Sequence, residues 1–97
     1  MSTYVCLLNW TDQGVRDAKA TVDRSKAARD LASRMGGELR DLYWTMGPYD
    51  LVATATFPDS ETATAFLVAL SSQGNIRTTG MPAFSEDEMT GILGKVG

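Results

Sequence analysis

The order of strand-like and helix-like segments constrains the fold of this chain more than any other feature. Residues 3–9, TYVCLLN, combine β-branched, aromatic and aliphatic side chains, which predicts a strand. Both faces of this strand are apolar, as is typical of a central strand covered on both sides. Two helical segments follow, a short one over 12–19 with Thr11 as its cap and a longer one over 22–35 that ends at Gly36-Gly37.

The longer helical segment carries an apolar stripe that predicts its core-facing side. The stripe residues recur at helical spacing and are Ala27, Ala28, Leu31, Ala32 and Met35. Arg24 and the other basic residues of this segment are expected mostly outside the stripe.

A hairpin and a second helix are predicted next. Residues 38–46 and 49–57 indicate two strands, with Gly47-Pro48 as a tight connection because proline cannot continue a ladder. Pro58 stops the second strand, and Asp59 or Ser60 then caps a helix over 60–73.

A fourth strand and a terminal helix complete the chain. The side chains of residues 75–83 alternate in character as they do in a strand. Gly80 and Pro82 within this segment indicate a bulge or an edge position. Ser85 and Glu88 form a capping-box pattern in front of a helix over about 86–95, whose apolar stripe holds Met89, Ile92, Leu93 and Val96.

The resulting order, β-α-β-β-α-β plus a terminal helix, predicts one α+β domain over residues 1–97 with the ferredoxin-like fold. Right-handed crossovers give an antiparallel four-stranded sheet in the order 4-1-3-2, with both helices on one face. The other face is then bare, although the central strands are apolar on both sides. We therefore expect a homodimer that packs sheet against sheet, or a larger assembly built from it, with the terminal helix sealing an edge.

The composition excludes several classes of function. The 97 residues include no histidine, which removes Ser-His and Cys-His pairs and the usual zinc, non-haem iron and haem ligand sets. We therefore expect no metal and no cofactor, and any general base must be Asp, Glu, Tyr or Lys.

Charge and hydropathy exclude other partners. The net charge is −3 and basic residues form no run, so no nucleic-acid partner is expected. No stretch has the roughly 18 apolar residues of a membrane helix, and the N-terminus does not resemble a signal peptide. The single cysteine, Cys6, allows no internal disulfide, which suits the cytoplasm.

The predicted topology gathers polar and aromatic side chains at one rim of the sheet. Neighbouring strands run in opposite directions, so the ends of strands 1 and 2 lie beside the starts of strands 3 and 4. This rim is typical of a small-ligand pocket, and its candidate binding residues are Asn9, Trp10, Thr45, Tyr49, Asp50, Asn75 and Arg77.

Each candidate also has a plainer interpretation. Asp50 or Tyr49 could act in proton transfer, but Asp50 could equally cap turn N–H groups or pair with Arg77. Arg77 could hold a ligand carboxylate or phosphate, or only form an ion pair. Asn75 follows Gly74, which favours a role in the turn. Cys6 is expected to be an inert buried thiol.

Three separated stretches, LLNWTDQG (7–14), MGPYDLV (46–52) and GNIRTTGMPAF (74–84), resemble the GYD-domain proteins, a family of small bacterial proteins. The resemblance covers roughly residues 3–95, and the residues of the family name occur here as Gly47, Tyr49 and Asp50 with Pro48 inserted. It implies a dimeric α/β barrel of the ferredoxin-like group and no particular reaction.

Three functions are compatible with this sequence. The first is a cytoplasmic, homodimeric small-molecule-binding protein with its pocket at the rim. The second is a cofactor-free enzyme, an oxygenase or isomerase, that uses Asp50 or Tyr49 for proton transfer. A subunit that only builds a larger assembly is a third possibility.

Overall fold

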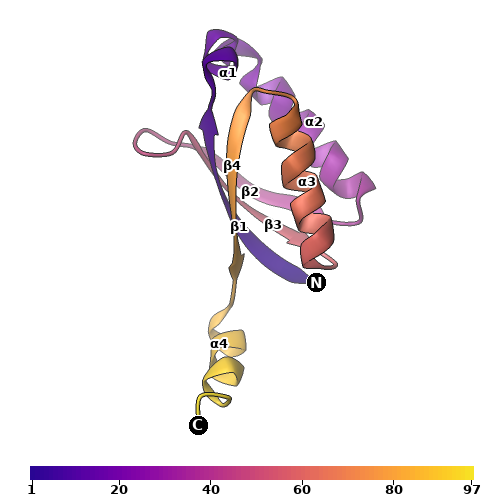
Figure 1. The fold of residues 1–97 in the computed structure, drawn as a ribbon, viewed down its shortest axis with the longest axis vertical. Coiled ribbons are helices and arrows are strands. Elements are labelled where there is room, and N and C mark those ends of the chain that lie inside the picture. Colours follow the sequence, from indigo (N-terminus) through magenta and orange to yellow (C-terminus); the bar gives the residue numbers. More distant parts are fainter.

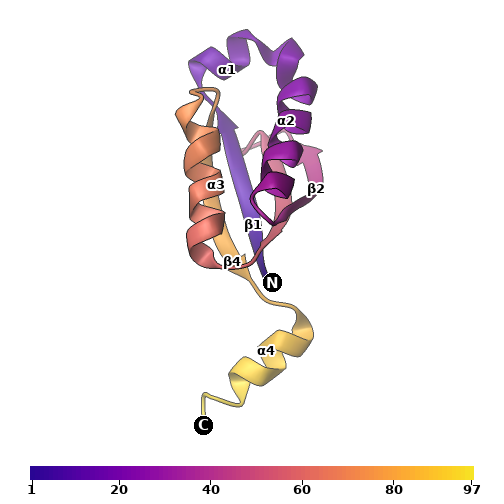
Figure 2. The same cartoon turned by 90° about the vertical axis from the view of Figure 1, so that its right-hand side faces the viewer.

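Four strands and two long helices form the body of the protein. The computed structural model describes residues 1–97 and contains β1 (Ser2–Trp10), α1 (Asp12–Arg16), η1 (Ala18–Ala20), α2 (Thr21–Arg34), β2 (Glu38–Trp44), β3 (Leu51–Phe57), α3 (Ser60–Ser72), β4 (Ile76–Ala83) and α4 (Glu86–Leu93). The strands form one antiparallel sheet in the order β2-β3-β1-β4. This is the predicted order 4-1-3-2 read from the other edge, and α2 and α3 lie on the same face of the sheet (Figures 1 and 2).

Side-chain caps fix the starts of three helices as the sequence predicted. The Thr11 hydroxyl accepts a hydrogen bond from the Gly14 N–H at 3.1 Å, and the Asp59 carboxylate accepts one from the Thr62 N–H at 2.7 Å. Ser85 and Glu88 exchange the two hydrogen bonds of a capping box. Because each cap satisfies an N–H group that the first turn leaves unpaired, the helices begin where these residues stand.

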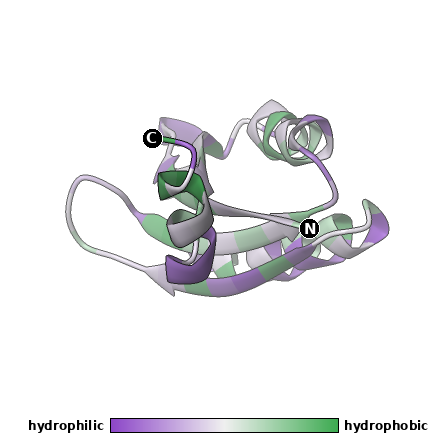
Figure 3. Ribbon diagram, turned by 90° about the horizontal axis from the view of Figure 1, so that it is seen from below, coloured by the Kyte–Doolittle hydropathy of each residue, from purple (hydrophilic) through white to green (hydrophobic).

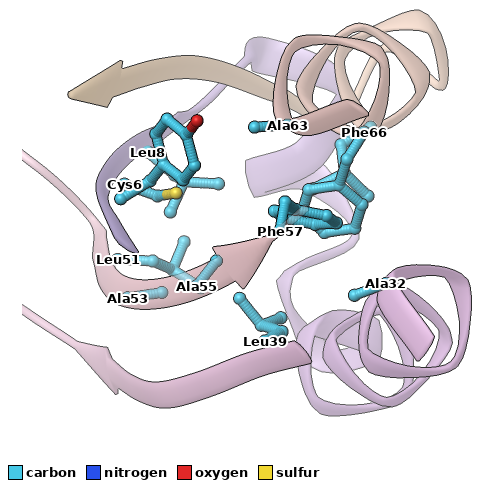
Figure 4. Close-up of a cluster of buried hydrophobic side chains, with 12 residues drawn as sticks. Cys6, Leu8, Ala32, Leu39, Leu51, Ala53, Ala55, Phe57, Ala63 and Phe66 are labelled. Atoms are coloured by element: carbon cyan, nitrogen blue, oxygen red, sulfur yellow. The ribbon is translucent and has the colours of Figure 1, made fainter. Parts of the chain in front are cut away.

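The core lies between the sheet and the two helices (Figure 4). Its largest members, Phe57 of β3 and Phe66 of α3, are almost fully buried, and their ring centroids are 5.1 Å apart. Many of the remaining core side chains are small, among them Cys6 and several alanines. Only 14 of the 97 residues are buried, so the isolated chain has a small core for its length and gains from further burial.

The other face of the sheet has no helix over it (Figure 1). Side chains alternate across a strand, so Val5 and Leu7 of β1 lie on the face opposite the buried Tyr4, Cys6 and Leu8. Their cross-strand neighbours include Val52 and Met81, which extend the apolar surface. We call this surface of Val5, Leu7, Val52 and Met81 the outer face.

Two segments project from the body. Helix α4 stands away from the sheet at the end of β4 (Figures 1 and 2), and its Met89 and Leu93 side chains are exposed. The loop between β2 and β3 extends away on another side (Figure 3), with Met46 fully exposed. None of the helices has the length and apolar character that crossing a bilayer requires.

Two predictions about the early helices were wrong in detail. The helix predicted over 12–19 ends at Arg16, because the backbone at Asp17 leaves the helical region (φ −114°, ψ 42°) before a short 3₁₀ turn. In α2, Ala27 is exposed, whereas Arg24 is half-buried. Arg24 turns inward because its guanidinium donates to the carbonyl oxygens of Gly14 and Asp17 at 3.2 and 2.8 Å.

Two predictions about the strands also need correction. The β2–β3 connection is not a tight turn, because ladder pairing stops at Trp44 and resumes at Leu51, leaving a six-residue loop around Gly47 and Pro48. The edge position of β4 is confirmed, but its pairing with β1 is continuous and contains no bulge. The irregularity lies in β2 instead, between Leu39 and Leu42.

Candidate functional site

The antiparallel register brings the predicted rim together from three strands. Asn9 at the end of β1 pairs with Arg77 at the start of β4. Asp50 directly precedes β3, whose first residue Leu51 pairs with Leu8 of β1. Residues 68 positions apart in the chain are therefore neighbours, as expected where adjacent strands run in opposite directions.

An open groove of about 640 Å³ lies at this rim, and all but one of its lining residues are polar, glycine or proline. The lining residues are Asn9, Trp10, Thr11, Asp12, Gln13, Pro48, Asp50, Gly74 and Arg77. Four of the seven predicted binding residues are among them, namely Asn9, Trp10, Asp50 and Arg77. The groove therefore lies at the rim where the sequence gathers these residues.

Asp50 is fixed to the end of β1 by main-chain hydrogen bonds. Its Oδ2 accepts the Trp10 N–H at 2.9 Å, and its own N–H donates to the Leu8 carbonyl oxygen at 2.9 Å. Its carbonyl oxygen accepts the Thr45 N–H at 2.8 Å. The carboxylate thus continues the β1–β3 ladder by one residue beyond the strand, which explains its position in front of an apolar strand.

Arg77 does not pair with Asp50. The only ion pair of the chain joins Arg24 and Asp17 at 3.8 Å, so the exposed guanidinium of Arg77 has no carboxylate partner. Its neighbour Asn9 is half-buried and also lines the groove. A free guanidinium beside an amide is an arrangement that suits an anionic group, because the guanidinium fork can donate two parallel hydrogen bonds.

The other three predicted residues shape the rim without lining the groove. The Thr45 hydroxyl donates to the Tyr49 carbonyl oxygen at 2.5 Å and so closes the β2–β3 loop. The Asn75 carbonyl oxygen accepts the Thr11 N–H at 3.1 Å, and its Oδ1 accepts a hydrogen bond from Gln13 at 2.9 Å. The turn role expected for Asn75 is thus the one it has.

Among the aromatic side chains at this end of the sheet, only Trp10 lines the groove. Trp10 packs against the core. Tyr43 is 65% exposed, and the Trp44 indole N–H donates to the Thr21 hydroxyl at 3.0 Å, which links the end of β2 to the start of α2. The groove is consequently more polar than the sequence indicated.

Sequence reasoning missed the α1 side of the groove. Asp12 and Gln13 line it because Thr11 bonds to the turn before β4, with its hydroxyl donating to the Gly74 carbonyl oxygen at 2.5 Å. Gly14 permits this close approach, since a Cβ there would lie 2.0 Å from the Asn75 carbonyl oxygen. The signal was available, because these residues directly follow the strand end that carries Asn9.

A second hollow lies on the helix side of the sheet. It has a volume of about 60 Å³ and lies between the sheet and helices α2 and α3, with 12 of its 17 lining residues hydrophobic. Cys6 of β1 is among them, and burial raises the pKa of its thiol above the ordinary 9.0. The thiol is 3% exposed and remains protonated at neutral pH, which agrees with the predicted inert role.

The sheet order, the two helices on one face and the rim groove define a ferredoxin-like α+β domain. The sequence profile of the GYD domain matches residues 4–93. The chain therefore belongs to the GYD domain family, as its three sequence stretches indicated.

Solved structures share the fold at low sequence identity. TTHA0845 from Thermus thermophilus is 23% identical, with a TM-score of 0.56, and the match covers 88% of this chain and 95% of that one. The hypothetical protein PHS023 from Pyrococcus horikoshii is 19% identical, with a TM-score of 0.57 and coverages of 89% and 93%.

MtbAldR is 14% identical, with a TM-score of 0.68, and the match covers 88% of this chain. This chain spans about half the length of MtbAldR, because the match covers 54% of that protein. None of the curated proteins matches the chain. At these identities the solved structures establish the fold and nothing more.

Proposed function

We propose that this chain is a homodimeric small-molecule-binding protein whose site is the rim groove. The observation that carries the proposal is the unpaired guanidinium of Arg77, which lines a polar groove beside Asn9 and Asp50. An anionic group of the ligand lies against Arg77 and Asn9, and the rest of the ligand extends along the groove towards Trp10. The ligand is therefore a small, partly apolar molecule with a carboxylate or phosphate group.

The geometry supports binding over catalysis. A cofactor-free enzyme that moves a proton through Asp50 needs this carboxylate in a site that excludes water. Asp50 instead lines a groove that is open to solvent, and one of its oxygens accepts the Trp10 N–H. Tyr49, the other proton-transfer candidate, is not among the groove residues.

The outer face supports the homodimer. Val5, Leu7, Val52 and Met81 form an apolar surface that the chain itself does not cover, and such surfaces usually mark an interface. The projecting α4 adds the exposed side chains of Met89 and Leu93. A second copy placed on the outer face lies next to the rim groove, because Asn9 belongs to β1 and Arg77 to β4, the strands that also carry Val5, Leu7 and Met81.

Binding at the rim is tested by titrating isotope-labelled protein with inorganic phosphate and following its ¹H–¹⁵N NMR spectrum. We expect the largest shifts at Asn9 and Arg77, and we expect Arg77→Gln to weaken phosphate binding about tenfold or more. Arg34→Gln, which removes an exposed arginine from the last turn of α2, is the matched control and leaves the titration unchanged. The proposal fails when Arg77→Gln binds phosphate as the unsubstituted protein does.

The homodimer is tested by sedimentation equilibrium. The unsubstituted protein is expected to sediment as a dimer, and Leu7→Glu is expected to dissociate it by placing a charge on the outer face. Val68→Glu makes the same kind of change at an exposed position of α3 and leaves the dimer intact. A monomer at tens of micromolar protein, or equal dissociation by both variants, rules out this interface.

A further inference from the structure

The cavity between the sheet and the helices is lined mainly by large apolar side chains, with small ones at three apolar positions. Its floor includes Cys6 and Ala53 of the sheet, and Ala28 of α2 and Leu67 of α3 stand on either side. Figure 4 shows Cys6 and Ala53 on the sheet, to the left of the helices that carry Phe66 and Ala32. The small side chains at these three positions leave space that the larger neighbours do not fill, and unfilled apolar space costs stability until a ligand occupies it.

Polar groups lie at one end of this apolar cavity. They include Thr21, Arg24 and Ser25 at the start of α2 and Gln73 after α3. The side chain of Arg24 is 20% exposed, and the only carboxylate near it, Asp17, is 3.8 Å away and 74% exposed. Two of its guanidinium nitrogens donate to main-chain oxygens, which holds the positive charge in place at the cavity.

The size of the cavity limits the class of ligand. About 60 Å³ is several times the space that one water occupies and less than the cavity that holds a benzene ring. Twelve of the 17 lining residues are hydrophobic, so most of the wall suits a hydrocarbon group better than water. A chain of a few carbon atoms fits.

We propose that this cavity binds a small molecule with a short aliphatic chain and a carboxylate, with the chain inside the cavity and the carboxylate at Arg24. The site lies on the helix side of the sheet and is separate from the rim groove, although Trp10 lines both. It does not depend on the function proposed for Arg77.

The test is a ¹H–¹⁵N NMR titration with the straight-chain carboxylates from propionate to octanoate. Each added methylene is expected to raise the affinity about fourfold until the cavity is full, after which the affinity levels off. The largest shifts are expected at Cys6, Ala53 and Leu67. The alcohol of the same chain length is expected to bind about tenfold more weakly, because it lacks the charge that Arg24 recognises.

Two variants locate the site. Ala28→Leu fills the cavity and is expected to lower carboxylate affinity tenfold or more, whereas Ala27→Leu adds the same atoms on the exposed side of the same helix and changes nothing. Arg24→Gln is expected to make the affinity for the carboxylate equal to that for the alcohol. This second variant tests the site even when Ala28→Leu does not fold.

The outcomes separate this proposal from the rim site. If the cavity is the site, Arg77→Gln leaves the affinities for the carboxylates unchanged. If Arg77→Gln abolishes carboxylate binding, the carboxylates bind at the rim and the proposal is overturned. The proposal is also overturned if the affinity for the carboxylates does not grow with chain length. It is likewise overturned if Ala27→Leu and Ala28→Leu change that affinity equally. If the unsubstituted protein binds the carboxylates in the cavity but does not bind phosphate at the rim, only the function proposed for Arg77 is refuted.

Discussion

Replacing Gly14 by alanine should disrupt the rim, because this glycine lets α1 pack directly on the turn before β4. An added Cβ would lie 2.0 Å from the Asn75 carbonyl oxygen and 2.9 Å from its carbonyl carbon. Both atoms belong to the main chain, so no side-chain rotation relieves the clash. A carbon–oxygen contact needs about 3.3 Å or more, so α1 must move by about 1 Å away from β4.

The cost follows from the contacts that this movement breaks. The Thr11 N–H donates to the Asn75 carbonyl oxygen at 3.1 Å, and the Thr11 hydroxyl donates to that of Gly74 at 2.5 Å. Each bond contributes about 1 kcal/mol net, and overpacking adds about 1–3 kcal/mol. Alanine recovers up to about 1 kcal/mol of helix propensity. The free energy of unfolding should therefore fall by about 2–4 kcal/mol, which lowers Tm by roughly 10–20 °C.

The assay is urea denaturation followed by circular dichroism at one fixed protein concentration, because dimerisation shifts apparent stability. Gly91→Ala is the matched control, since a Cβ at Gly91 in α4 meets no atom within 4 Å. It should be neutral or stabilise by up to about 1 kcal/mol. The reasoning is refuted when Gly14→Ala unfolds at the same urea concentration as Gly91→Ala.

Four further changes test other parts of the structure. Asp50→Ala should lower the free energy of unfolding by about 1–3 kcal/mol in urea denaturation, because a main-chain N–H of β1 loses its acceptor; equal stability would contradict the assigned hydrogen bond. Phe66→Ala should lower the free energy of unfolding by about 3–5 kcal/mol. Val68→Ala, at a position 61% exposed on the same helix, should lower it far less, and similar values for the two variants would place the core elsewhere. The hydrogen bond from the Thr62 N–H holds the pKa of Asp59 below its ordinary 3.8. The stabilisation by this cap is therefore complete above pH 3.8 and is lost as the pH falls below that value. Asp59→Asn should flatten the pH dependence of Tm below about pH 4, and an unchanged slope would refute this. Burial raises the pKa of the Cys6 thiol, so at pH 8 iodoacetamide should label Cys6 in the folded protein about tenfold or more slowly than in the urea-unfolded protein. The free energy of unfolding should fall as the pH rises above about 9. Fast labelling of the folded protein would contradict the burial of Cys6.

Helices, strands and their order could be predicted because local chemistry decides them. The caps at Thr11, Asp59 and Ser85 mark helix starts through hydrogen bonds to residues within the same turn. Strand order follows from the order of the elements and the handedness of their connections. The gathering of Asn9, Asp50 and Arg77 at one rim follows in turn from that order.

The features that could not be predicted from the sequence depend on contacts between distant segments. The pattern of α2 predicts a solvent-facing Arg24, yet this residue turns inward because the connection before α2 presents the carbonyl oxygens of Gly14 and Asp17. The helix-side cavity is lined by residues of the sheet, α2 and α3 together, and the periodicity of a single segment does not predict how these elements pack. Trp44 lies away from the groove for the same reason, since its indole N–H donates across to Thr21.

Native mass spectrometry of the purified protein tests the proposed homodimeric binding protein most directly, because one spectrum reports both subunit number and bound small molecules. We expect a species of twice the 10.5 kDa chain mass that carries an additional small mass, and we expect Arg77→Gln to keep the doubled mass and lose the addition. A spectrum containing only the single chain, with nothing bound, would contradict the account.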